Sequence, residues 1–124
     1  MVNHPLFGPL LMFGSGGVTA ELYADRVFRV LPLTDLDVHQ LVAATKASRL
    51  LAGWRGAPAA DIAAVEDLLL RVARLADDLP ELAEMDLNPV IARPNGVTVV
   101  DAKLRLAPAP PPQPPTRRLR DARR

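Results

Sequence analysis

The chain contains no cysteine among its 124 residues. Disulfide bonds and thiolate metal ligands are therefore excluded, and this composition fits a reducing compartment. No hydrophobic stretch reaches the roughly 18 residues that a membrane-spanning helix needs. No basic segment precedes an apolar one at the N-terminus, as a secretory signal would require. We therefore expect a cytoplasmic protein without a membrane partner.

The chain also has little excess charge, with a formal net charge of +1. Residues 1–116 contain ten Lys or Arg against thirteen Asp or Glu, so this mildly acidic part offers no basic face for a nucleic acid. Residues 117–124 contain five Arg against one Asp and follow a proline-rich stretch. We predict at most one domain, over residues 5–106, and a disordered linker with a basic tail over residues 107–124. Such a tail could contact an acidic partner, RNA or a membrane surface, but a solvated end is the simpler expectation.

Turn signals divide the body into short strands. An apolar stretch at residues 9–13 leads into Gly14-Ser15-Gly16-Gly17, which predicts a strand followed by a tight loop. Residues 26–31 predict a second strand that Pro32 ends. Alternating apolar residues around a Pro-Asn-Gly turn predict a closing β-hairpin over about residues 84–104.

Two helices are predicted between these strands. Thr34 is a good N-cap for a helix that extends to about Ala47. Asp61 caps a second helix, whose apolar residues recur every three or four positions as far as Leu79. The expected architecture is α+β, with the two helices covering one face of a small antiparallel sheet and the other face left for a ligand.

The closing hairpin carries oxygen-bearing side chains in register. If the loop comprises the four residues Arg93 to Gly96, Ala92 pairs with Val97, and counting back places Asn88 opposite Asp101. A two-residue loop, Asn95-Gly96, would shift the pairing by two and keep both on one face, whereas a three-residue loop would separate them. Opposed side chains have Cβ atoms roughly 5 Å apart.

An Asn carbonyl and an Asp carboxylate at that separation can share a hard cation such as Mg²⁺. Asp86 precedes Asn88 by two residues and therefore projects to the same face. Asp and Asn are also common near turns and on solvated strand faces, which is the alternative interpretation. The apolar character of the rest of the hairpin favours a functional reason for its polar groups.

The glycine loop is the second candidate site. Gly14, Gly16 and Gly17 would let backbone amides approach an anion closely, because glycine has no Cβ atom. The loop is not a P-loop, since no Gly-Lys-Ser/Thr follows it. A tight turn between strands explains the same residues and remains an alternative.

Five motifs in order resemble the C-terminal part of the ATP-grasp domain in ADP-forming acyl-CoA synthetases, the acetate–CoA ligase relatives of succinyl-CoA synthetase. The resemblance covers about residues 5–106. The motifs are Phe7-Gly8-Pro9-Leu10-Leu11-Met12-Phe13-Gly14-Ser15-Gly16-Gly17, Glu21, Phe28-Arg29-Val30-Leu31-Pro32-Leu33, Leu51-Ala52-Gly53-Trp54-Arg55-Gly56, and Asp86-Leu87-Asn88-Pro89-Val90 with Val100-Asp101-Ala102-Lys103.

The resemblance implies roles for single residues. Those matching Asn88 and Asp101 hold the Mg²⁺ that bridges nucleotide phosphates, and the acidic residue matching Asp86 lies beside them with a catalytic role. Many relatives carry Glu at the position of Asp86. The glycine loop and Glu21, at a position where the family also has an acidic residue, would contact the nucleotide.

The resemblance also implies a function. The parental reaction converts a carboxylic acid, CoA and ATP into acyl-CoA, ADP and phosphate, and some relatives are fused to an acetyltransferase of the GNAT type. CoA and the acid bind to domains that do not match this chain, so we expect the C-terminal piece of a larger enzyme, or a subunit that needs a partner, and no activity from the chain alone. The alternatives are a non-catalytic module that docks on a partner protein, and an RNA-binding role for the tail.

Overall fold

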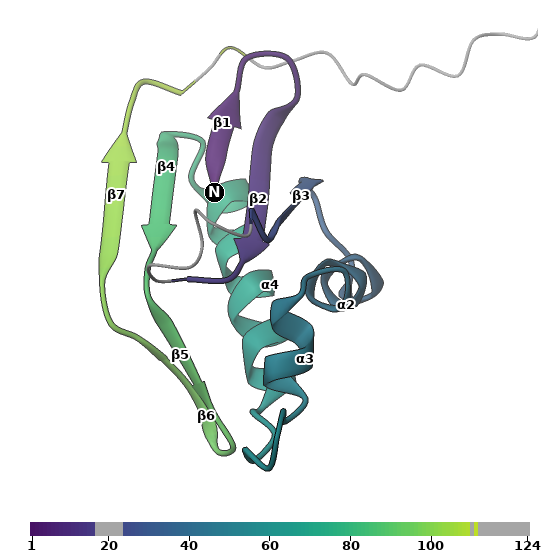
Figure 1. Cartoon of the computed structure of the whole chain (residues 1–124). Helices are drawn as coiled ribbons and strands as arrows, with labels where there is room; N and C mark the ends of the chain where they lie inside the picture. Colours follow the sequence, from purple (N-terminus) through teal and green to yellow (C-terminus); the bar gives the residue numbers. More distant parts are fainter. Residues whose placement is uncertain (17–23, 110, 112–124) are drawn as a thin grey trace, which may run out of the picture.

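The computed structural model describes residues 1–16, 24–109 and 111, and these form seven strands and three helices (Figure 1). Five strands make one antiparallel sheet in the order β3-β2-β1-β4-β7, and β5 pairs with β6 in a separate two-stranded sheet. None of the helices in these described ranges is long and apolar enough to cross a membrane. The elements are β1 (Val2–His4), β2 (Gly8–Gly14), β3 (Arg26–Val30), α2 (Asp35–Ala43), α3 (Ala47–Leu51), α4 (Ile62–Asp78), β4 (Leu82–Leu87), β5 (Val90–Arg93), β6 (Gly96–Val99) and β7 (Ala102–Leu106).

The core lies between one face of the sheet and the helices α2 and α4. Apolar residues of α4 recur at helical spacing, and the buried ones pack against the buried residues of α2 and against Leu11 of β2. Complete burial of one such side chain contributes about 1.5–3 kcal/mol. The buried cluster comprises Leu11, Val38, Leu41, Val42, Val65, Leu69 and Val72.

Strand alternation gives the sheet two different faces. Leu11 and Phe13 of β2 and Met85 of β4 contact the core, while their neighbours Met12 and Asp86 are exposed on the opposite face. No helix of the described residues covers that outer face, which is turned toward the viewer in Figure 1. The helices therefore cover one side of the sheet, as the α+β interpretation predicts.

The closing hairpin has the predicted register. Ala92 pairs with Val97 and Arg93 with Gly96, so the tightest turn consists of Pro94 and Asn95. The same register continues through β4 and β7, where Asp86 pairs with Lys103 and Leu87 with Ala102. Between the two sheets the chain passes through a cis Asn88–Pro89 peptide.

Two elements differ from the sequence expectation. The strand β1 was not expected, because three residues are too few to show an alternating pattern. The helix predicted to reach Ala47 ends at Ala43, and a separate short helix, α3, begins at Ala47. The reason is a competing acceptor, since the amides of Lys46 and Ala47 donate to the carboxylate of Asp25. Within the described residues, three helices therefore replace the two expected.

Candidate cation and phosphate site

Asn88 and Asp101 lie opposite each other where the two sheets meet. The amide of Asn88 donates to the carbonyl oxygen of Asp101 at 3.1 Å, and the amide of Val100 donates to that of Pro89 at 3.0 Å. Both Asn88 and Asp101 are exposed, as is Asp86 two residues earlier. The structure thus brings these backbone positions together as predicted, with all three side chains in reach of solvent.

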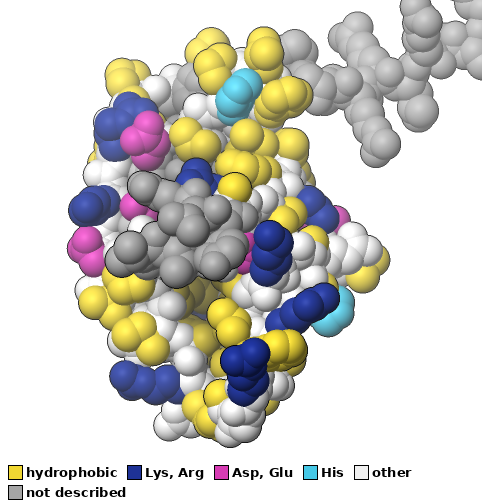
Figure 2. All heavy atoms as spheres, viewed as in Figure 1, with side chains coloured by type: hydrophobic (Ala, Val, Ile, Leu, Met, Phe, Trp, Pro, Cys, Tyr) yellow, Lys and Arg dark blue, Asp and Glu magenta, His cyan; other side chains and the backbone are white. Residues whose placement is uncertain are grey.

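Charged pairs flank this position on β4 and β7. Arg105 donates to Glu84 at 2.8 Å, and this hydrogen bond is the main reason why the pKa of Glu84 lies below its usual value. The Lys103 ammonium lies 3.9 Å from the Asp101 carboxylate. Figure 2 shows acidic and basic side chains gathered over these two strands, at the left edge of the molecule. Anionic and cationic groups therefore stand side by side next to Asn88.

The glycine loop approaches Asn88 from β2. A Cβ atom built on Gly16 would lie 3.6 Å from the side-chain oxygen of Asn88. Gly14 lies so close to β3 that a Cβ atom there would come within 2.0 Å of the Asp25 carbonyl oxygen. Two predicted nucleotide-binding residues, Gly17 and Glu21, lie outside the described residues. The predicted glycine and cation sites are thus neighbours at Gly16 and Asn88.

Asp25, which the sequence analysis missed, stands at the base of this loop. It is only 6% exposed. Its carboxylate accepts the Ser15 hydroxyl at 2.6 Å and the amides of Lys46 and Ala47 at 2.7 and 2.9 Å. Burial alone would raise the pKa of Asp25, but these hydrogen bonds outweigh it and hold the pKa below the usual value. No local sequence signal marks such a residue, because its partners are 10 to 22 positions away.

An apolar area adjoins the polar one on the outer face of the sheet. Leu10 pairs with both Val2 and Val30, and Met12 pairs with Phe28, so these side chains share that face. Val2, Met12, Phe28 and Val30 are between 37% and 51% exposed. The spacing of Phe28 and Val30, two positions apart in a predicted strand, was the available signal for this outward apolar row. The outer face therefore offers an apolar half on β1–β3 and a polar half on β4 and β7.

The donor set suits magnesium better than a metal held entirely by protein. The described residues contain no group of three or more His, Asp or Glu side chains placed to hold a metal ion. Asn88 and Asp101 supply two oxygen donors with open surroundings, and Asp86 lies nearby. Mg²⁺ commonly takes one or two protein ligands and completes its octahedron with water and substrate phosphates. The residues present fit that arrangement.

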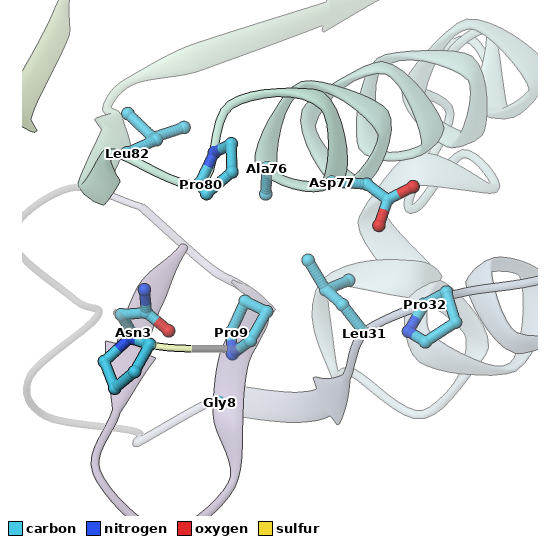
Figure 3. A pocket seen from close by; sticks show the side chains of 10 residues that line it. Asn3, Gly8, Pro9, Leu31, Pro32, Ala76, Asp77, Pro80 and Leu82 are labelled. Carbon is cyan, nitrogen blue, oxygen red and sulfur yellow. The ribbon is translucent and has the colours of Figure 1, made fainter. Parts of the chain in front are cut away.

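A separate hollow lies between the β1–β2 hairpin and the end of α4 (Figure 3). Prolines and aliphatic side chains make up most of its lining, and Asp77 is the only charged one among the described residues that line it. The hollow shares no residue with the site around Asn88. It is lined by Asn3, Gly8, Pro9, Leu31, Pro32, Ala76, Asp77, Pro80, Leu82 and Pro111.

Comparisons with known proteins agree with this geometry. A family model described as an ATP-grasp domain matches residues 1–106. The ADP-forming acetate–CoA ligase I of Archaeoglobus fulgidus is 49% identical over 104 residues, which are 84% of this chain and 15% of that protein. The β subunit of the ADP-forming acetate–CoA ligase II of Pyrococcus furiosus is 45% identical over 107 residues, covering 84% of this chain and 45% of that subunit.

Solved structures show the same fold. The dinucleotide-forming acetyl-coenzyme A synthetase 1 of Candidatus Korarchaeum cryptofilum, in complex with coenzyme A and Mg-AMPPCP, matches with a TM-score of 0.82 and 48% identity. The match covers 86% of this chain and 50% of that chain. The chain spans between 15% and 50% of the length of each of these relatives.

Proposed function

The chain belongs to the ATP-grasp family, as the corresponding part of ADP-forming acetate–CoA ligases does, and on this premise we propose that it forms the wall of a magnesium–nucleotide site that contacts the phosphates. The family resemblance and the partial ATP-grasp fold expected from the sequence are confirmed. The observation that carries the proposal is the meeting of Gly16 with the Asn88 side chain, directly across from Asp101.

Each predicted residue has a role in this proposal. Asn88 and Asp101 would hold the Mg²⁺ through their side-chain oxygens, and Asp86 would stand beside them with a catalytic role. The cation would neutralise phosphate charge when bound. The backbone at Gly14 and Gly16 contacts the phosphates, and Gly17 and Glu21 remain predicted contacts outside the described residues.

The two halves of the outer sheet face support a nucleotide as the ligand. A nucleotide has a flat, largely apolar base at one end and charged phosphates at the other. The exposed side chains of Met12 and Phe28 offer an apolar surface on the same outer face of the sheet as the exposed Asp86. A ligand carrying only phosphate would leave this apolar surface uncovered.

Acyl-CoA formation from a carboxylic acid, CoA and ATP is proposed for an assembly and not for the chain alone. The chain matches only 15% to 50% of the length of its relatives. We propose that the CoA and acid sites lie in parts of the enzyme that it does not match. These parts would be supplied by a partner subunit or by further domains. The cytoplasmic location and the acetyltransferase fusion remain predictions.

The test is magnesium-dependent binding of AMPPCP, followed by NMR chemical shifts of the 124-residue chain. We expect shifts in β4, β7 and Gly16 that require Mg²⁺. We expect Asp101→Ala and Asn88→Ala to weaken binding about tenfold or more, because each removes a cation ligand. Asp67→Ala is the matched control, since Asp67 is exposed on α4 and pairs only with Arg71. Chemical-shift changes that do not depend on Mg²⁺, or that persist in Asp101→Ala, would contradict the proposal.

A non-catalytic docking module is the second candidate function. The exposed apolar row of Val2, Met12, Phe28 and Val30 is the observation that favours it. Such a module would bind its partner without nucleotide and would be unaffected by Asn88→Ala. The NMR titration therefore separates the two candidates.

A further inference from the structure

The buried carboxylate of Asp25 joins three parts of the molecule. Asp25 immediately precedes β3, and its backbone carbonyl accepts the amide of Ser15 just beyond β2, at 3.1 Å. Its side chain binds the hydroxyl of the same Ser15 and two amides at the start of α3. The end of β2, the beginning of β3 and the beginning of α3 are thus held by one residue.

Capping α3 alone does not account for this arrangement. A neutral Ser or Asn would satisfy helix amides without the cost of burying a charge. The hydrogen bond with Ser15 is also short, as expected when the acceptor is ionised. Gly14 brings the backbone of β2 against the carbonyl of Asp25, in a space that no side chain could share. The charge of Asp25 and the glycine at position 14 therefore fix the position of the chain directly after β2.

The segment directly after β2 leads to the candidate site. Ser15 is followed by Gly16, which lies beside the Asn88 side chain, since a Cβ atom built on Gly16 would be 3.6 Å from the side-chain oxygen of Asn88. Among the described residues, the other hydrogen-bond donors to the Asp25 side chain are the amides of Lys46 and Ala47, at the N-terminus of α3. A displacement of Ser15 would therefore move Gly16 relative to Asn88, while the buried cluster of α2 and α4 stayed in place.

We propose that Asp25 is a positioning residue for the cation and phosphate site, holding Ser15 so that the backbone of Gly16 keeps its place beside the Asn88 side chain. This inference rests on the proposed function. Asp25 itself does not contact the cation or the nucleotide. Its effect passes through Ser15 and Gly16 to the orientation of the Asn88 oxygen.

Two substitutions test the proposal at different points. Asp25→Asn keeps the shape of the side chain but replaces one acceptor oxygen with an NH₂ donor. That NH₂ group would face the Ser15 hydroxyl or the amides of α3, which are donors themselves. Ser15→Ala removes only the hydroxyl and leaves α3 capped, so it tests the link if Asp25→Asn fails to fold. The matched controls are Ser48→Ala, whose hydroxyl binds the Thr45 carbonyl at 2.6 Å, and Asp61→Asn at the N-cap of α4.

Two readouts are needed, both on the 124-residue chain. Without ligand, we expect Asp25→Asn and Ser15→Ala to move the NMR resonances of the Asn88 side-chain amide and the Gly16 backbone amide, and both controls to leave them in place. With Mg²⁺ and AMPPCP, we expect about tenfold weaker binding in the two test variants, equivalent to about 1.4 kcal/mol, and less than about twofold change in the controls.

The outcomes separate this inference from the proposed function. Unmoved Asn88 and Gly16 resonances in Ser15→Ala would overturn the inference, as would equal loss of binding in Ser48→Ala. Moved resonances together with no nucleotide binding by the unmodified chain would overturn the proposed function and support the link from Asp25 to Asn88. A merely stabilising role for Asp25 would lower the melting temperature without moving the Asn88 side-chain resonance.

Discussion

At the scale of single residues, the site depends on how closely backbones can approach each other. Gly14 and Gly16 are two positions apart, yet their surroundings differ sharply. A Cβ atom on Gly14 would overlap the Asp25 carbonyl oxygen at 2.0 Å, whereas one on Gly16 would meet the Asn88 oxygen at an ordinary contact distance of 3.6 Å. Gly14 is therefore required by packing, and Gly16 leaves room that a ligand can use.

We predict opposite results for the two Gly→Ala variants. Gly14→Ala forces β2 and β3 apart and should lower the free energy of unfolding by about 2–3 kcal/mol. Gly16→Ala should change it by less than about 0.5 kcal/mol but should weaken Mg²⁺–AMPPCP binding, because the added methyl group occupies space beside Asn88. Urea denaturation followed by circular dichroism measures the first effect. Equal stability loss in both variants would contradict the close approach at Gly14.

Asp25 shows what sequence reasoning cannot reach at this scale. An isolated Asp between Ala24 and Arg26 has the pattern of any solvated loop residue. Its structural role comes from its hydrogen bonds with Ser15, Lys46 and Ala47. Asn88 and Asp101 were predictable because the turn at Pro94 and Asn95 sets their register locally.

At the scale of elements, local signals predicted strands and helices where they were strong. The capping residue Thr34 and the apolar stripe after Asp61 identified α2 and α4. An apolar stretch before the glycine loop identified β2, and a stretch that Pro32 ends identified β3. The C-terminal end of α2 and the presence of α3 were set by Asp25, through tertiary contacts with no local pattern. The division of the closing hairpin into two sheets was likewise beyond the sequence pattern.

The helix α2 offers a test of its local signal. The Thr34 hydroxyl accepts a hydrogen bond from the Asp37 amide at 3.2 Å, and the Asp37 carboxylate accepts one from the Thr34 amide at 2.8 Å, forming a capping box. Thr34→Ala should lower the free energy of unfolding by about 1 kcal/mol, while Thr34→Ser should retain most of it. Thr98→Ala, in an exposed position of β6, is the control in the same chemical denaturation experiment. An equal loss in Thr98→Ala would argue against the capping role.

At the scale of the whole molecule, hydrogen bonds to acidic side chains make the stability of the fold depend on pH. The pKa of Asp25 is lowered because its hydrogen bonds outweigh burial, which acts in the opposite direction. Hydrogen bonds from Thr34 lower the pKa of Asp37, and one from Arg105 lowers that of Glu84. Carboxyl groups with a lowered pKa in the folded state stabilise it above their unfolded-state pKa, and this contribution is lost as the pH falls through the folded-state value.

We therefore predict that the chain loses stability on acidification below about pH 5, with no comparable loss between about pH 6 and 8 from these three groups. Asp25→Asn should reduce the slope of stability against pH, because Asp25 is buried and its carboxylate accepts three hydrogen bonds, which makes it the largest contributor. Exposed Glu84 should matter little, since water screens its pair with Arg105. Melting temperatures measured across this pH range in the unmodified chain, in Asp25→Asn and in Glu84→Gln test whether Asp25 contributes more than Glu84. A larger reduction of the pH dependence in Glu84→Gln than in Asp25→Asn would contradict the prediction.

The register of the closing hairpin imposes a rule of parity on its length. Asn88 and Asp101 share a face because residues are added to β5 and β6 in opposed pairs between them. Lengthening the hairpin by an even number of residues preserves that relation. An odd change turns one oxygen donor to the other side of the sheet unless a β-bulge absorbs it. The hairpin can thus grow or shrink over evolution in steps of two without separating its two oxygen donors.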